Sequence, residues 1–198
     1  MAAPTEYQWV ITSTNYDSDP KHPRWLKFDG VDDYLNLPYM GLYANGSASV
    51  VMAIARSKTG TIKYALTEGH PAGGKNYIPL RLSDTGISSR IINDAGTTVI
   101  LTPVGAGIPT SLPEVITFID DSANLKLLKN SQTSNNSSYA RSGTLTLNNL
   151  TIGAISQTTV TENMLANLYG LIITKSALTD SQRVACERHL GRKSGVIL

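Results

Sequence analysis

Residues 26–38 read LKFDGVDDYLNLP, two short apolar runs on either side of an Asp-Gly turn and an aspartate pair. Polar and apolar side chains alternate in both runs, which is typical of strands that bury one face. Gly30 can adopt the positive φ that a tight reversal needs. The segment therefore predicts a β-hairpin whose apolar face must be covered by a second layer.

The same pattern extends along most of the chain. Charged residues make up only 16% of the sequence, and 16 glycines punctuate its apolar runs. We expect short strands at 8–12, 25–28, 34–37, 49–56, 62–67, 77–82, 88–92, 97–101, 115–119, 125–128, 144–147, 150–152 and 168–174. The Ser- and Asn-rich segment 130–142 is predicted to be a loop. Many short strands at this spacing indicate an all-β sandwich or barrel.

One helix is predicted near the C-terminus. Residues 179–182, Thr-Asp-Ser-Gln, form a capping box, in which the Thr and Gln side chains satisfy free backbone amides. Gly191 stands where a left-handed residue ends a helix, so we expect the helix to span 180–190. One face of it would carry Gln182, Cys186, His189 and Leu190. Cys186 is therefore predicted to pack in the core rather than to react.

Composition excludes several function classes. A net charge of +2, from 17 basic and 15 acidic residues, leaves no basic patch for nucleic acid. The single cysteine excludes an internal disulfide, and His22, His70 and His189 are too far apart for a zinc site. The first residues lack a basic and apolar leader, and no later run is long enough to span a bilayer. We therefore expect neither a classical signal peptide nor a membrane segment.

Several segments, taken in order, resemble the laminin-G-like jelly rolls of the concanavalin A-like lectin and glucanase superfamily. The segments that carry this resemblance are 26–38, 49–54, 119–130, 150–153, 168–173 and 177–196. The resemblance implies an all-β, two-sheet antiparallel jelly-roll sandwich with a short C-terminal α-helix. That domain would span 25–198, preceded by an N-terminal arm, 1–24.

The superfamily that the chain resembles includes glycosidases, which act through a pair of carboxylates. Such jelly rolls usually supply the pair from alternate positions of one strand, and no Glu-x-Asp-x-Glu run is present. The glutamates stand apart, at Glu6, Glu68, Glu114, Glu162 and Glu187.

A phosphate-binding loop motif is matched only in part. The match at 69–75 is followed by Asn76 and a strand pattern, whereas the motif requires Ser or Thr and then a helix. We therefore expect no catalytic residues.

Calcium is the one metal that the sequence leaves open. The acidic and amide pairs 32–33, 93–94 and 120–121 offer oxygen ligands in turns. Calcium needs six to eight oxygens, and such residues form turns without any ion. We expect a calcium-independent fold with no metal site and no cofactor; calcium in a rim loop is the alternative.

Two segments combine aromatic and polar side chains in the way that carbohydrate sites do. The candidate ligand-binding residues are His70, Lys75, Asn76 and Tyr77 in one loop, and Asn136, Tyr139 and Arg141 in the other.

The chain ends are unusually apolar, at Tyr7, Trp9, Val196, Ile197 and Leu198. These residues either pack on the sandwich or form an assembly interface.

These observations lead to a functional hypothesis. We expect a non-catalytic structural protein of a tailed-phage virion (tail fibre, baseplate or capsid decoration), assembled in the host cytoplasm. Its partners would be copies of itself, as a homotrimer, other virion proteins and host surface polysaccharide, with neither nucleic acid nor membrane. The alternative is a carbohydrate-recognition module of a bacterial surface protein. A glycan-cleaving enzyme ranks third.

Overall fold

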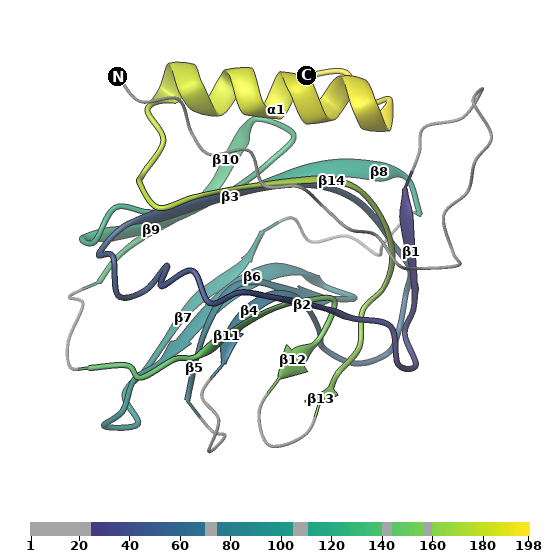
Figure 1. The fold of residues 1–198 in the computed structure, drawn as a ribbon. Coiled ribbons are helices and arrows are strands. Elements are labelled where there is room, and N and C mark those ends of the chain that lie inside the picture. The colour runs from purple at the N-terminus through teal and green to yellow at the C-terminus, as the bar shows by residue number, and fades with distance from the viewer. Residues whose placement is uncertain (1–24, 70–74, 105–110, 140–143, 157–159) are drawn as a thin grey trace.

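The computed structural model describes residues 25–69, 75–104, 111–139, 144–156 and 160–198, which form two stacked antiparallel sheets and a helix (Figure 1). Sheet A has the order β1 (Leu26–Asp29), β14 (Leu165–Thr174), β3 (Ala48–Arg56), β8 (Pro113–Asp120), β9 (Asn124–Lys129) and β10 (Gln132–Ser138). Sheet B has the order β2 (Leu35–Leu37), β11 (Asn149–Ile152), β4 (Lys63–Gly69), β5 (Asn76–Ser83), β6 (Gly86–Ile92) and β7 (Thr98–Val104). A short ribbon, β12 (Ile155–Ser156) with β13 (Val160–Thr161), and helix α1 (Asp180–Ser194) complete the fold. The predicted jelly-roll sandwich is confirmed.

The turn at Gly30 joins the two sheets instead of closing a hairpin. β1 pairs with β14 in sheet A, whereas β2 pairs with β11 in sheet B. Gly30 has φ +81°, and a Cβ there would meet the Cβ of Leu165 at 3.0 Å. The predicted hairpin between these two strands is therefore wrong. Local alternation identified both strands correctly, but it does not say which strand each one pairs with.

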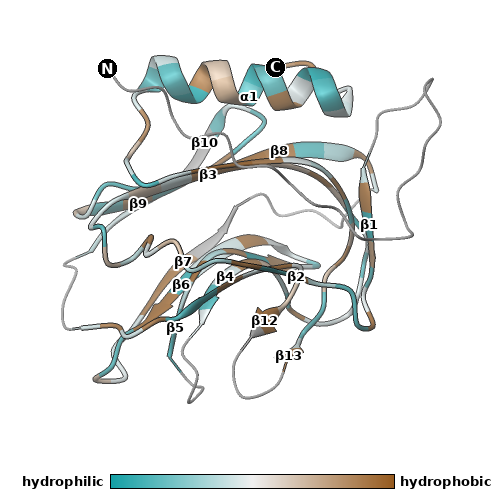
Figure 2. Cartoon of the chain, viewed as in Figure 1, coloured by the Kyte–Doolittle hydropathy of each residue, from teal (hydrophilic) through white to brown (hydrophobic). Residues whose placement is uncertain are grey.

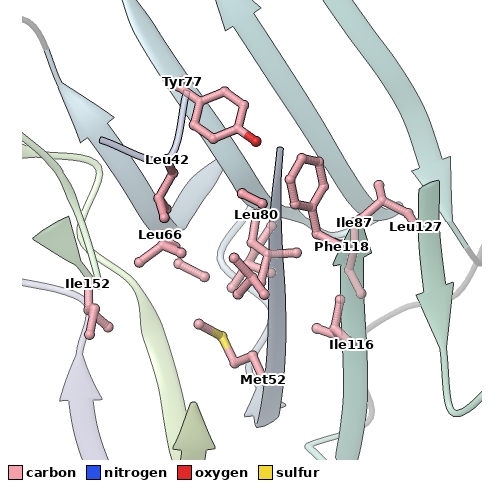
Figure 3. Packing of buried hydrophobic residues seen from close by; sticks show 14 of the residues in the cluster. Leu42, Met52, Leu66, Tyr77, Leu80, Ile87, Ile116, Phe118, Leu127 and Ile152 are labelled. Atoms are coloured by element: carbon pink, nitrogen blue, oxygen red, sulfur yellow. The ribbon is translucent and has the colours of Figure 1, made fainter. Parts of the chain in front are cut away.

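The main core lies between the two sheets. Tyr77 packs edge-on against Tyr43 and Phe118, with ring centroids 5.5 and 6.0 Å away, respectively. Figure 3 shows these rings of Tyr77 and Phe118 among aliphatic side chains of both sheets, including Leu66 and Met52. Large apolar residues from alternating positions thus fill the sandwich, which is how a jelly roll is stabilised.

Two predicted elements differ from the structure. The segment 130–142, predicted to be a loop, contains β10, an edge strand that pairs with β9. An edge strand needs only backbone partners on one side, so its polar composition hides it from an apolar pattern. The segment 144–147 is not a strand, although Leu145 and Leu147 are buried as a strand pattern predicts. Its backbone bonds instead to Asp94, whose amide donates to the carbonyl of Thr144 (2.9 Å).

Helix α1 covers the outer face of sheet A. The predicted capping box is present at Thr179, but the helix continues to Ser194 and ends at the left-handed Gly195 (φ 78°). Gly191 does not end the helix because it lies inside it, against the returning C-terminal segment, where a Cβ would meet the carbonyl oxygen of Val196 at 2.9 Å. Figure 2 shows α1 as a mostly hydrophilic helix above apolar strands.

The buried face of α1 is rotated from the predicted one. It presents Glu187, Leu190, Gly191 and Ser194 to the sheet, whereas Gln182 and His189 are exposed. Cys186 is half-buried and packs against the cluster of Val51, Ala53, Val115 and Leu190, as predicted. Among the residues that the structure describes, no helix is long and apolar enough to cross a membrane.

Candidate functional site

The outer face of sheet B, on the side away from sheet A, carries two arginines. Tyr77 and Ile91 point into the main core, so their strand neighbours Ile78 and Arg90 point outward. Ile78 is directly opposite Arg90 in the pairing of β5 with β6. Residues directly opposite each other in an antiparallel pair share a face, so these two side chains are neighbours.

A β-bulge brings the second arginine to the same face. The register of β5 against β6 shifts between Ile78 and Arg81, and Arg81 then lies opposite Tyr64 of β4. Without the extra residue, positions three apart on one strand would face opposite sides of the sheet. The bulge therefore groups Tyr64, Ile78, Arg81 and Arg90 on the outer face.

An apolar base supports this group. Tyr64, Ile78 and Ile155 form a buried cluster that is separate from the main core. Ile155 belongs to β12, and Figure 1 shows β12 and β13 on the side of sheet B that faces away from sheet A. The hydroxyl of Thr67 on β4 donates to the carbonyl of Ala154 at 3.1 Å, which ties this ribbon to the sheet.

Tyr64 holds the guanidinium of Arg90 in place. Nη2 of Arg90 donates to the Tyr64 hydroxyl at 3.3 Å, and the guanidinium carbon lies 5.8 Å from the centre of the Tyr64 ring. A cation at this distance from an aromatic ring is attracted to it. Arg90 is therefore oriented by a neutral partner that leaves its charge uncompensated.

Neither arginine of this face has an acidic partner in the described part of the chain. Both side chains are half-buried, and the Nε atoms of Arg81 and Arg90 are buried without a hydrogen-bond partner. Burial lowers the pKa of Arg81, and the charge of Arg90 lowers it further. By contrast, Arg56 on sheet A pairs with Glu114. Two partly desolvated guanidiniums without a counter-ion form a site that favours an anion, above all a planar carboxylate.

We name the four residues Tyr64, Ile78, Arg81 and Arg90 the arginine face. None of them was predicted from the sequence as a binding residue. A signal was present, since Arg81 and Arg90 are each the one charged residue of their strand. It was missed because a charged residue at such a position normally just faces water.

Tyr77 and Tyr139, predicted as sugar platforms, are core residues. Tyr77 is fully buried and Tyr139 is 9% exposed, and their hydroxyls donate to the carboxylate of Asp120 at 2.9 and 3.0 Å. The strand β5 begins at Asn76, so alternation directs the Tyr77 ring inward. The two tyrosine side chains therefore meet at Asp120 in the interior, and neither ring is accessible for stacking on a sugar.

The other predicted ligand-binding residues are dispersed. Lys75 lies 3.9 Å from the carboxylate of Asp94, and Asn76 is fully buried, with no hydrogen-bond partner for its side-chain amide in the described segments. Asn136 is exposed on β10 of sheet A. His70 and Arg141 lie outside the described residues. A binding role for Lys75, Asn76 and Asn136 stays a prediction.

Some residues of the apolar chain ends pack against the domain, and others are exposed or lie outside the described residues. Val196 and Leu198 pack against the cluster between α1 and sheet A, whereas Ile197 is 99% exposed. Intramolecular docking therefore accounts for two of the three C-terminal residues. Tyr7 and Trp9 lie outside the described residues, so their role at an assembly interface stays a prediction.

The candidate calcium ligands are used in turns. The predicted pair Asp32 and Asp33 lies beside Asp29, and the three carboxylates each place an oxygen within 4.8 Å of the others, at the turn between β1 and β2. Asp29 accepts from the amide of Val31 (2.8 Å), and Asp33 accepts from the amide of Asp29 (2.9 Å). The amide of Val31 contributes most to lowering the pKa of Asp29.

The two other pairs also serve the backbone. Asp121 accepts from the amide of Asn124 (2.6 Å), and Asn93 accepts from the amide of Thr97 (2.8 Å). These contacts are the turn-forming roles that the sequence favoured. The expectation that the fold needs no calcium stays a prediction.

Comparison with known proteins identifies the fold. No family model matches this chain, and no curated protein sequence matches it. The structure is similar to the CBM40 of the Ruminococcus gnavus IT-sialidase, with a TM-score of 0.64 and 11% identity over 81% of this chain and 96% of that one. It is also similar to the NanB sialidase of Streptococcus pneumoniae, with a TM-score of 0.66 and 12% identity.

A third similar structure is the binding domain of botulinum neurotoxin serotype D, with a TM-score of 0.65 and 12% identity over 89% of this chain and 45% of that one. The match to NanB covers 80% of this chain but only 26% of that sialidase, so this chain spans about a quarter of it. At these identities the likeness establishes the jelly-roll fold alone.

Proposed function

We propose that this chain is a non-catalytic, lectin-like domain that binds acidic glycans at the arginine face. The observation that carries the proposal is the pair of half-buried guanidiniums, Arg81 and Arg90, neither of which has an acidic partner among the described residues. Holding two cations partly out of water without a counter-ion costs free energy, which a carboxylate ligand would recover through charge-assisted hydrogen bonds to the guanidiniums. The bound sugar would place its carboxylate between the two arginines, beside Tyr64, whose hydroxyl and ring orient Arg90.

The structural neighbours support the same ligand class. The Ruminococcus gnavus CBM40 has been determined bound to α2,3 and to α2,6 sialyllactose. Sialyllactose carries a carboxylate on its terminal sugar, which is the group that an arginine pair recognises. These structures of the neighbour alone, rather than as part of a whole sialidase, also favour binding over catalysis for this chain.

The test is to titrate the full chain with α2,6-sialyllactose and, separately, with lactose, and to measure binding by calorimetry. We expect saturable binding of the acidic sugar only, weakened by salt because its charge contacts are partly exposed. Arg90→Gln should lower the affinity at least about thirtyfold, since a charged partner is lost from a desolvated pair. Arg192→Gln, on the exposed face of α1, is the matched control and should leave binding unchanged. Equal binding of lactose, or full affinity of Arg90→Gln, would exclude the proposal.

Display of this domain on a tailed-phage virion remains part of the proposal, with a bacterial surface protein as the alternative. Light scattering of the purified full chain provides the first test, because a fibre component should form the predicted homotrimer. A monomer at micromolar concentration would favour the bacterial surface module. Release of new reducing ends from an acidic polysaccharide would revive the third hypothesis, a glycan-cleaving enzyme.

A further inference from the structure

An exposed isoleucine lies directly beside the arginine face. Ile100 of β7 is opposite Arg90 in the pairing of β6 with β7. The next pair along, Ile91 with Val99, packs on the main core, so Arg90 and Ile100 share the outer face. Ile100 is 49% exposed.

The position of Ile100 is unusual within this molecule. The exposed large hydrophobic residues of the described chain are Val31, Tyr34, Tyr39, Ile62, Ile100, Leu112 and Ile197. Six of them lie in turns, connections or the C-terminal segment, and Ile100 is the one that lies within a strand. A strand at a sheet edge normally carries polar or charged side chains on its solvent face.

Arg90 has a second isoleucine on its other side, but that one is not accessible. Ile78 lies opposite Arg90 on β5 and is fully buried by Tyr64 and Ile155. Ile100 therefore supplies the free apolar surface next to the guanidinium. Directly opposite residues have Cβ atoms about 5 Å apart, a span that a single sugar ring with its substituents covers.

We propose that Ile100 is a specificity-determining residue that selects acidic sugars bearing an apolar N-acyl substituent. The inference rests on the proposed function, since it places the carboxylate at Arg81 and Arg90. Sugar hydroxyls gain nothing from an aliphatic side chain, because they would lose water without a hydrogen bond in return. A methyl group of an N-acetyl substituent gains by leaving water and covering Ile100.

The experiment compares two ligands on one protein. The first is α2,6-sialyllactose, which carries an N-acetyl group, and the second is its analogue with a hydroxyl in place of the acetamido group. The wild-type chain should prefer the N-acetyl ligand. Ile100→Thr, which keeps the β-branched shape, should weaken binding of the N-acetyl ligand about fourfold, the effect of losing contact with one methyl group. Its binding of the hydroxyl analogue should remain as in the wild type.

Two further variants make the result interpretable. Val31→Thr also replaces an exposed β-branched aliphatic residue by threonine, in the turn between β1 and β2, and should alter neither affinity. Ile100→Val preserves strand propensity and should give an intermediate preference if Ile100→Thr folds poorly. An unchanged ratio of affinities in a folded Ile100 variant would overturn this inference and leave the arginine face intact. Failure of the wild-type chain to bind either acidic ligand would overturn the proposed function as well.

Discussion

The outer face of sheet A is covered by α1, whereas the outer face of sheet B presents the arginine face. Under α1 the buried Glu187 accepts hydrogen bonds from Thr117, Ser131 and Arg183, each at 2.7 Å. On sheet B, Arg81 and Arg90 are partly buried with no acidic partner in the described segments. Within the described residues, a buried charge is thus compensated on one face and two partly buried charges are left uncompensated on the other.

This difference separates structural polar groups from functional ones. A buried charge with all of its partners fixes how two elements dock. A buried charge without such partners lowers the stability of the fold. Evolution retains it only where it serves a function, and binding of an anionic ligand is such a function. The number of hydrogen-bond and ion-pair partners of a buried charge therefore indicates its role better than the number of charged residues on a face.

The largest expected effect tests the compensated face. Glu187→Ala leaves Arg183 without its buried partner and removes the acceptor of two hydroxyls, so it should lower the free energy of unfolding by about 3 kcal/mol. Urea denaturation of the full chain measures this. Arg188→Ala, one residue away on the exposed side of α1, is the control and should stay within about 0.5 kcal/mol of the wild type. Equal effects of the two variants would mean that α1 is not held by Glu187.

The second prediction contrasts two arginines. Arg183→Met removes a paired charge and should cost about 2 kcal/mol, since Glu187 loses an ion-pair partner. Arg81→Met removes an unpaired charge and keeps the side-chain volume, so the urea midpoint should stay unchanged or rise. The same variant should bind acidic glycan more weakly. If Arg81→Met destabilises the protein as much as Arg183→Met, Arg81 has a partner in solution.

A third prediction concerns the buried tyrosine that the sequence suggested as a sugar platform. Tyr77→Phe keeps the ring and removes the hydroxyl that donates to Asp120, so it should cost about 1.5 kcal/mol. Its affinity for acidic glycan should equal that of the wild type. The control, Tyr34→Phe, changes a tyrosine that is 40% exposed and should not affect stability measurably. A loss of glycan affinity without a loss of stability would restore Tyr77 as a platform.

The fold was predictable because its signals are local. Alternation, glycine turns and the capping box at Thr179 each depend on neighbours in sequence, and they identified most strands and the start of α1. The pairing of β1 and β2 with different sheets depends on contacts far along the chain, at β14 and β11. The end of α1 was missed because Gly191 is used for close packing, which has the same sequence signature as a helix stop.

The candidate site was much less predictable. Tyr77 was predicted to begin a strand, 77–82, but alternation alone does not say which face of that strand is buried, so its ring was proposed as a sugar platform. The arginine face depends on a bulge between Ile78 and Arg81, and on the pairing of three strands. A single-residue shift of register would send either arginine to the core side, so strand spacing alone could not group them.

The smallest expected effect concerns thiol reactivity, which compares the covered outer face of sheet A with the open outer face of sheet B. Burial raises the pKa of the Cys186 thiol, and the nearby charge of Glu187 raises it further, so less reactive thiolate is present at pH 8. Alkylation of Cys186 by iodoacetamide should therefore be about tenfold slower in the folded chain than in urea. In a Cys186→Ser background, Ile100→Cys places a thiol on the open face beside Arg90, whose charge should lower that pKa. Alkylation of this thiol should be fast, and it should slow when α2,6-sialyllactose is added. Equal alkylation rates of Cys186 and of the thiol at position 100 would show that α1 does not shield the outer face of sheet A.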